Sequence, residues 1–342
     1  INSASQGLQK IQNGDSILIL GDLTLTDGVI SGVTADNTIQ VRGNVYQTSA
    51  FLGTSAFYGA ISVSLSGSTT QVFNVSGGIL PGVMMVANTD VSMNFETGVD
   101  ATINGPLTMS GGTFLSTSGT LSIGDVNYDC CDISISGGTF SHNNGEVSFI
   151  GRNDSINVNS SLTFNDLTFN KASSKTETIT SGDRLISEGT LTLTEGTLNG
   201  GTLEPQGNVI IKSTHNGGTT SMRFTGASDQ ILEHESSTII SGNMTIAKPA
   251  GTVSLSGALT VNNSGQDLIM TGGTLDLLGY DLTVNDQFTI GTGTTLRLTG
   301  DQTITGGPDT IQANSTVHYD DSAGTNTLLD VNYWNMIIGS TG

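Results

Sequence analysis

The chain has 342 residues, of which 46 are glycine, and only 12% are charged and 5% aromatic. Its formal net charge of −20 opposes binding to phosphate backbones and to anionic membranes, so we expect neither nucleic acid nor lipid headgroups as partners. The hydrophobic share of 35% is too high for a disordered chain, and no apolar run is long enough to predict a membrane span.

The first segment, residues 1–14, is expected to be an N-terminal cap or a frayed end. Leu8 and Ile11 fall three positions apart before a glycine. This spacing leaves a short helix over residues 3–13 as one option.

An eight-residue pattern, apolar-x-apolar-x-x-Gly-x-apolar, then recurs along the chain. Alternating apolar residues predict a short strand, and the glycine predicts a sharp corner that needs a positive φ before the next strand. The six copies are Leu23–Ile30, Phe73–Leu80, Leu107–Phe114, Ile133–Phe140, Leu191–Leu198 and Leu268–Leu275.

Residues 15–146 are therefore predicted to be solenoid coils, with a loop excursion near residues 43–60 where the rhythm breaks. That stretch holds a dense aromatic group, formed by Tyr46, Phe51, Phe57 and Tyr58. Aromatic side chains on a loop suit contact with a glycan or a neighbouring subunit, and covering the core is the structural alternative.

Cys130 and Cys131 are the only cysteines. On a strand their side chains would point to opposite faces, one buried and one exposed; a vicinal disulfide is the alternative. Two adjacent cysteines cannot form a structural zinc site by themselves.

A longer repeat covers residues 147–316, with units of about 147–221 and 222–316. Phe149–Ile156 returns as Phe224–Ile231, shifted by 75, and Asp166–Lys171 returns as Asn243–Lys248, shifted by 77. Residues 317–342 are predicted to begin a third unit that is cut off. This segment contains Tyr333 and Trp334, which are further candidate contact residues, with packing at an end or junction as the simpler explanation.

These patterns predict an all-β fold, a β-solenoid (parallel β-helix, with the right-handed form favoured) of short coils with glycine corners. Coils of about 20–26 residues would give roughly 13–16 turns. A β-sandwich array is the main alternative and predicts antiparallel hairpins and more aromatic residues. The glycine- and threonine-rich coils resemble repetitive bacterial or archaeal cell-surface β-solenoid proteins, such as filamentous-haemagglutinin-like adhesins and autotransporter-passenger-like stalks.

Three groups of acidic residues are candidates for sugar-cleaving chemistry, which needs two carboxylates across a scissile bond. They are Asp129 with Asp132, Glu233-His234-Glu235, and Asp320-Asp321 beside His318 and Tyr319. We expect solvated outer turns, and hence no catalytic or metal-binding residue and no cofactor. Calcium is compatible with turns rich in Asp and Asn, although no calcium-loop motif allows a site to be assigned.

The expected function is that of an extracellular structural protein of a prokaryote. It would be a rigid stalk or a self-assembling filament or coat subunit at the cell surface, without enzyme activity. Its expected partner is a second copy of itself, by end-to-end or lateral contacts. The first alternative is an adhesin that binds glycans, and the second is a β-helix polysaccharide lyase or hydrolase.

Overall fold

A computed structural model describes most of the chain. The described residues are 8–11, 15–26, 29–32, 37–47, 51–52, 62–67, 69–76, 78–80, 82–85, 91–96, 98–127, 129–235, 240–299, 302–320 and 327–339. They contain no helix, and 58% of the residues lie in strands. The chain divides into two compact units, residues 1–183 and residues 184–342.

The first unit consists of strands β1 to β21. Their bounds are β1 Leu8–Ile11, β2 Ser16–Ile19, β3 Leu23–Leu25, β4 Val29–Gly32, β5 Thr38–Val41, β6 Val45–Gln47, β7 Phe51–Leu52, β8 Ser62–Leu65, β9 Gln71–Val75, β10 Gly78–Leu80, β11 Gly82–Met85, β12 Val91–Phe95, β13 Ala101–Ile103, β14 Leu107–Leu115, β15 Thr120–Ile123, β16 Ile133–Ser141, β17 Glu146–Gly151, β18 Asp154–Val158, β19 Ser161–Phe164, β20 Asp166–Lys171 and β21 Thr176–Ile179.

The second unit consists of strands β22 to β38. Their bounds are β22 Arg184–Ser187, β23 Leu191–Glu195, β24 Thr197–Asn199, β25 Thr202–Pro205, β26 Val209–Ile211, β27 Ser221–Phe224, β28 Gln230–His234, β29 Met244–Leu255, β30 Leu259–Val261, β31 Leu268–Asp276, β32 Leu282–Val284, β33 Phe288–Ile290, β34 Thr295–Thr299, β35 Ile304–Thr305, β36 Thr310–Ile311, β37 Thr316–Asp320 and β38 Asn335–Ile338.

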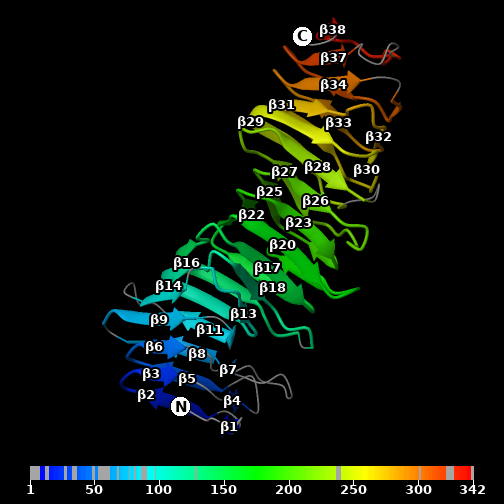
Figure 1. Cartoon of the computed structure of the whole chain (residues 1–342). Coiled ribbons are helices and arrows are strands. Elements are labelled where there is room, and N and C mark those ends of the chain that lie inside the picture. The colour runs from blue at the N-terminus through cyan, green and yellow to red at the C-terminus, as the bar shows by residue number, and fades with distance from the viewer. Residues whose placement is uncertain are drawn as a thin grey trace. The chain divides into compact units, whose positions relative to one another are not determined.

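Strands of successive coils pair in parallel, and three stacks of such strands surround the interior of each unit (Figure 1). In the first unit, β2-β5-β8-β11 continue into the first half of β14. The strands β3-β6-β9-β12 continue into the second half of β14. The third stack contains β1-β4-β7 and, farther along, β10-β13-β15-β17-β20.

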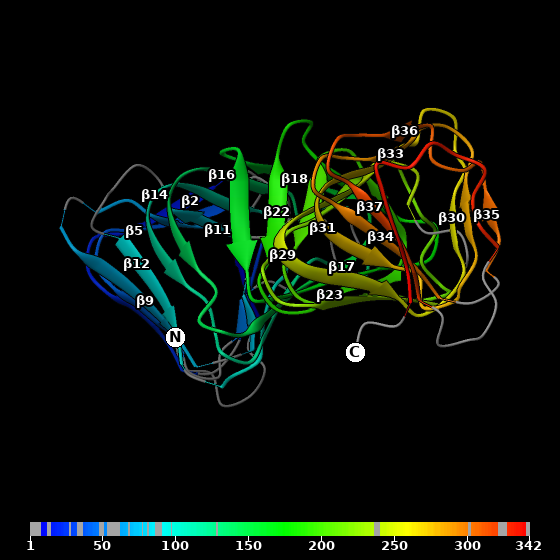
Figure 2. The same cartoon turned by 90° about the horizontal axis from the view of Figure 1, so that it is seen from above.

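The second unit repeats this arrangement. One stack is β22-β25-β27-β29-β31-β33-β36, and another is β23-β26-β28, the second halves of β29 and β31, and β34-β37-β38. The third is β30-β32-β35. Figure 2 shows the same strands from above, along the direction in which the coils stack. The units together make about 12 turns, so the predicted β-solenoid is confirmed.

Alternation along each strand builds the core. In β20, Leu167 and Phe169 are buried while Thr168 between them and Asn170 after them are more exposed, as the two-residue period of a strand requires. Parallel stacking then places like residues on one another, so Phe149 of β17 lies beside Phe169 of β20 with ring centroids 5.2 Å apart. A few aromatic rings and many aliphatic residues therefore suffice to fill the interior.

The glycine corners are confirmed by the backbone. At the glycine of the eight-residue pattern, φ is positive in all five copies whose glycine is described: Gly78, Gly112, Gly138, Gly196 and Gly273. The strands differ from the prediction, however. In β14, β16 and β31 a single strand runs through the glycines, because a register shift there bends the ladder without ending it.

Several sequence predictions need adjustment. Residues 8–11 form strand β1 and not a helix, and β6 and β7 continue the ladders within the predicted loop excursion of residues 43–60. About 12 turns form where 13–16 were expected, since some coils are longer, as the pairing of Val45 with Phe73 shows.

Every described pairing between neighbouring strands is parallel, which rules out the β-sandwich alternative. The boundaries of the larger repeat units and the handedness stay predictions. Among the described residues, no helix of the length and apolarity needed to cross a membrane occurs.

Candidate functional site

The aromatic group predicted near residues 43–60 is described only in part. Tyr46 lies in β6, faces outward and is 36% exposed. Phe51 is the first residue of β7 and pairs with Val29, but the position of its side chain is not described. Phe57 and Tyr58 lie outside the described residues. A binding role for this group therefore stays a prediction.

Tyr333 and Trp334 have different environments. The Tyr333 hydroxyl donates to Leu329 O at 2.6 Å and lies 2.6 Å from the hydroxyl of the buried Tyr319. Tyr333 thus fastens the segment before β38 to β37, which agrees with the packing interpretation. Trp334 is 58% exposed next to the exposed side chains of β38.

The cluster Glu233-His234-Glu235 lies at the end of β28 on an outer face, as expected. Glu235 pairs with Lys212 at 2.8 Å and accepts a hydrogen bond from Ser213 N at 3.1 Å. The bond from Lys212 lowers the pKa of Glu235, with the hydrogen bond from Ser213 as the second cause. His234 Nε2 lies 3.2 Å from Gly257 O. These contacts connect neighbouring coils, and Glu233 adds a weaker charge interaction with the same Lys212, which raises the pKa of that lysine mainly through its hydrogen bond with Glu235.

Asp320, the first residue of the predicted pair Asp320-Asp321, also forms an ion pair with a residue of a neighbouring coil. Asp320 and Asp276 both pair with Arg297, which lies between them in the ladder β31-β34-β37. The hydrogen bond with Asp320 raises the pKa of Arg297. His318 Nε2 lies 2.7 Å from Gly339 O, and Asp321 lies outside the described residues.

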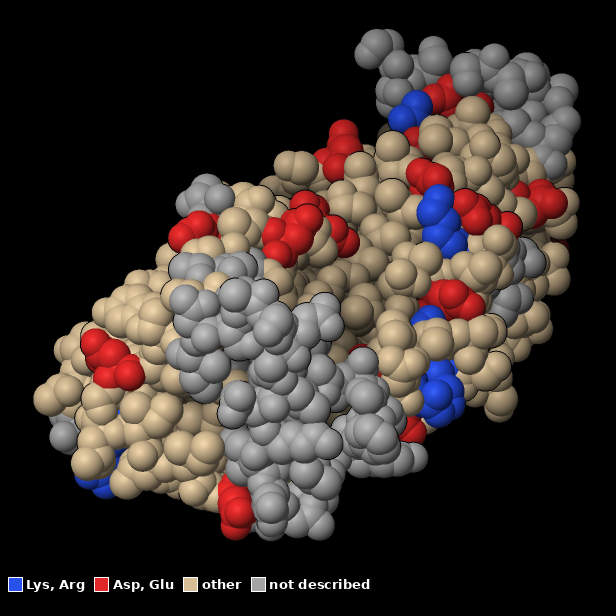
Figure 3. Space-filling model, turned by 60° about the horizontal axis from the view of Figure 1, so that its bottom comes forward, with Lys and Arg blue, Asp and Glu red and all other residues tan. Residues whose placement is uncertain are grey.

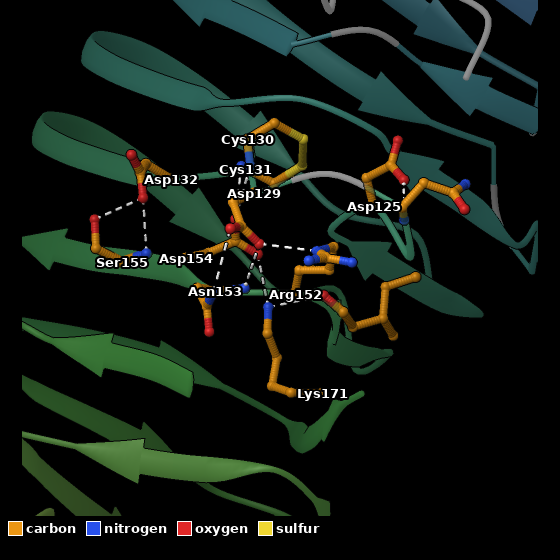
Figure 4. Close-up of a disulfide and its surroundings, with 12 residues drawn as sticks. Asp125, Asp129, Cys130, Cys131, Asp132, Arg152, Asn153, Asp154, Ser155 and Lys171 are labelled. Carbon is orange, nitrogen blue, oxygen red and sulfur yellow. Dashed lines mark hydrogen bonds and ion pairs between the residues drawn. A yellow bond between two sulfur atoms is a disulfide. The ribbon is translucent and has the colours of Figure 1, made fainter. Parts of the chain in front are cut away.

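Asp129 and Asp132 accept backbone hydrogen bonds from the next coil (Figure 4). The N–H of Asn153 donates to Asp129 at 3.1 Å, and that of Ser155 donates to Asp132 at 2.8 Å. The Asn153 bond is the main cause that lowers the pKa of Asp129. The same role recurs elsewhere in both units, at Asp22, Asp100, Asp229 and Asp281. Part of the strong negative charge thus serves to align coils.

No protein-family model, no curated protein and no solved structure matches this chain.

The most unusual cluster of side chains lies beside the cysteines in the first unit (Figure 4). Cys130 and Cys131 are joined by a vicinal disulfide and lie in a loop before β16, so the opposite-face arrangement expected for a strand does not apply. The backbone N–H groups of both cysteines donate to Asp154 Oδ1, at 3.2 and 2.8 Å. Asp154 therefore fixes the cysteine loop from the coil above.

Lys171 meets the other oxygen of Asp154. Its Nζ donates to Asp154 Oδ2 at 2.7 Å and to Ile150 O at 2.8 Å, and lies 2.9 Å from Glu177 Oε2. The three side chains are only 1–3% exposed. Burial raises the pKa of Glu177 to about 7, although the Lys171 charge opposes this shift. A buried amine thus lies in contact with two buried carboxyl groups.

Sequence reasoning missed this cluster, although it left a signal. Lys171 continues the inward alternation of Leu167 and Phe169, a position at which a lysine is rare unless paired. The 77-residue repeat leads to Lys248, which is also buried. Its Nζ donates instead to backbone oxygens of Thr225 and Ser228, at 3.0 and 2.8 Å, with two further oxygen partners.

A second feature that the sequence analysis missed is a buried glutamine at each of three corners between strands. Gln266 Nε2 donates to Ile240 O at 2.7 Å and to Gly242 O at 3.0 Å, both in the coil below. Asn243 Oδ1 accepts the N–H of the residue after the glutamine at 3.0 Å. The same three hydrogen bonds recur where Gln71 lies over Gly43-Asn44 and where Gln230 lies over Gly207-Asn208. A Cβ on any of these three glycines would collide with the backbone beneath it.

One hollow offers space for a small ligand. A hollow of about 400 Å³ in the first unit is lined by Gly78, Ile79, Asp100, Ala101, Thr102, Thr120 and Ser122. Its one carboxylate, Asp100, accepts the N–H of Thr120 at 2.8 Å. Within the described ranges, no group of three or more His, Cys, Asp or Glu side chains is arranged to hold a metal ion.

Proposed function

We propose that this chain is an exported structural protein of a prokaryote, a β-solenoid scaffold that self-associates and acts without a cofactor or enzyme activity. The observation that carries the proposal is the use of its buried polar groups. The Asp154–Lys171 pair and the Gln71, Gln230 and Gln266 corners bind the backbone or side chains of a neighbouring coil. In a scaffold, polar groups are expected to strengthen stacking in this way.

The charge on the surface suits a scaffold that is packed at high local concentration, and the disulfide supports a location outside the cytoplasm. On the face in Figure 3, carboxylates stand in separate small groups on a largely uncharged surface. Net negative charge favours solubility at high local concentration. The Cys130–Cys131 disulfide supports an oxidising compartment, because thiols of cytosolic proteins are normally kept reduced.

Self-association is supported by the outer edge of β38. Met336 and Ile338 continue the inward rows of Val317 and Tyr319, yet they are 45% and 58% exposed. A further parallel strand, from a following coil or from a second copy, would cover them, and because each is about half exposed the gain is about half of the ~1.5–3 kcal/mol for complete burial. Trp334 would gain cover in the same contact.

Sedimentation velocity and electron microscopy of the purified chain, over a range of concentrations, test this proposal. We expect oligomers or fibres that the double variant Met336→Lys with Ile338→Lys abolishes. Leu278→Lys, which changes a residue that is also 52% exposed but lies away from β38, is the matched control and should still assemble.

A chain that stays monomeric at every concentration and is retained on a glycan column would overturn the proposal in favour of the adhesin alternative. Antibody labelling of intact cells tests the location, and labelling that appears only after lysis would contradict export.

A further inference from the structure

The Lys171 cluster has the composition and geometry of a condensation site. Lys171 Nζ and Asp154 Oδ2 are 2.7 Å apart, the distance of a close ion pair, so the amine is held against the carboxyl group that it would attack. A third group, the Glu177 carboxyl, touches the same nitrogen at 2.9 Å. All three are held inside the first unit, on β18, β20 and β21.

We propose that Lys171 Nζ condenses with the carboxyl of Asp154 to form an intramolecular isopeptide bond, and that Glu177 transfers the proton. This inference is independent of the proposed scaffold function, and its failure would leave that function untouched.

The reaction balances without an added reagent. A proton first passes from the Lys171 ammonium to the Asp154 carboxylate within the ion pair, and the resulting amine attacks Cγ of Asp154 and forms the Nζ–Cγ bond. Glu177 takes a proton from Nζ and returns a proton to the departing oxygen, so that one C–O bond breaks and one water molecule leaves. No group is oxidised or reduced, and Glu177 ends in the state in which it began.

Position and burial both favour this step. Fixed contact between reacting groups replaces a collision in solution and so removes much of the entropic part of the barrier. Burial disfavours a separated ammonium and carboxylate, so a neutral amide removes a buried charge pair that is costly to desolvate. The side chain before Lys171 in the inward row is Phe169, which is 1% exposed and helps to exclude water.

Glu177 is suited to proton transfer for two reasons. Its pKa is raised to about 7, so both the acid and the carboxylate are accessible near neutral pH. Its Oε1 is buried without a hydrogen-bond partner, whereas Oε2 contacts Lys171. Protonation of an unpaired buried oxygen costs no existing hydrogen bond.

The bond would join two coils. Gly151 of β17 pairs with Lys171 of β20, and Asp154 of β18 pairs with Glu177 of β21, so Asp154 belongs to one coil and Lys171 and Glu177 to the next. The cross-link would therefore be a covalent connection across a ladder that is otherwise held by hydrogen bonds.

Lys248 provides a control within the same chain. It is as buried as Lys171, at 2% against 1% exposed, but its nitrogen is surrounded by backbone oxygens and the amide oxygen of Gln230. None of these acceptors is a carboxyl group, so we expect Lys248 to keep a free amine.

Intact mass spectrometry of the purified, denatured chain is the test. We expect a mass lower than that of the sequence by one water molecule, after allowance for the disulfide, and a cross-linked peptide pair that contains Lys171 and Asp154. Reductive methylation after denaturation should label Lys248 and leave Lys171 unlabelled. A folded protein with the full mass and a reactive Lys171 would overturn the proposal.

Three variants separate the roles. Glu177→Gln should fold, as judged by circular dichroism, and keep the full mass. Asp154→Asn should lose ammonia in place of water, because the same attack then expels the amide nitrogen. Lys248→Arg should still lose one water. Loss of water in Glu177→Gln would overturn the role of Glu177, and a cross-link mapped to Glu177 would overturn the assignment of Asp154.

Discussion

The buried glutamine corner allows a quantitative prediction for Gln266→Ala. The Gln266 side chain is fully buried and makes four hydrogen bonds: it donates to Ile240 O and Gly242 O and accepts from the N–H and Nδ2 of Asn263. At about 1 kcal/mol of net stabilisation for each bond, the loss is about 4 kcal/mol. That is a large share of the about 5–15 kcal/mol by which a domain is normally stable.

Hydrogen exchange followed by mass spectrometry suits this prediction, because repeat proteins open locally and a single unfolding midpoint averages over coils. Peptides that cover residues 240–246 and 263–268 should exchange about a thousandfold faster in the variant, since every 1.4 kcal/mol is about a factor of ten. Peptides from the first unit should keep their rates.

Gln287→Ala is the matched control, because Gln287 is exposed in the same unit. It should exchange like the parent chain. If Gln266→Ala also exchanges like the parent, the corner bonds do not stabilise the stacking, and the reasoning about buried polar groups is refuted.

Three further predictions concern stability in urea. Lys248→Met should lower the free energy of unfolding by about 3 kcal/mol or more, because buried oxygen atoms lose their donor, whereas Lys212→Met at an exposed ion pair should change little; equal effects would contradict this. Burial lowers the pKa of His215 to about 4, so the unfolded chain binds a proton that the folded chain does not as pH falls from about 6.5 to about 4. The His215 contribution to stability should therefore fall over that range, opposed by Glu177, whose pKa is raised in the folded chain. His215→Phe should make the slope of stability against pH between about pH 6.5 and about pH 4 differ from that of the parent chain by the His215 part; an unchanged slope would refute it. Finally, Cys130→Ser with Cys131→Ser should leave stability nearly unchanged, because a bond between adjacent residues constrains the unfolded chain very little, and a large loss of stability would argue against that view.

The sequence was informative where local chemistry decides the structure. Alternating apolar residues predicted the strands, and the recurring glycine predicted the positive φ found at Gly78, Gly112 and Gly196. The expectation that Glu233 and Glu235 lie on an outer face was also correct. Each of these inferences needs only residues within about eight positions of one another.

Features that depend on contacts between coils were missed. Lys171 follows Phe169 in an inward row, yet a lysine at the end of a strand is normally read as solvated. Its partners come from elsewhere, 17 residues before in the case of Asp154. The Gln266 corner likewise depends on Gly242-Asn243, and the short motif Gly-Asn-apolar, present at all three corners, is too brief to be recognised without the stacking.

Parallel, in-register stacking of coils is the central claim, and distances between spin labels test it most directly. Thr252, Thr274, Thr295, Thr316 and Asn335 are successive register partners on β29, β31, β34, β37 and β38. With one label at residue 252 and the second at 295, 316 or 335, the backbone separations should be about 10, 14 and 19 Å, a rise of about 4.8 Å for each coil. Distances that fail to increase in this order, or that exceed these values several-fold, would contradict the β-solenoid and the scaffold function built on it.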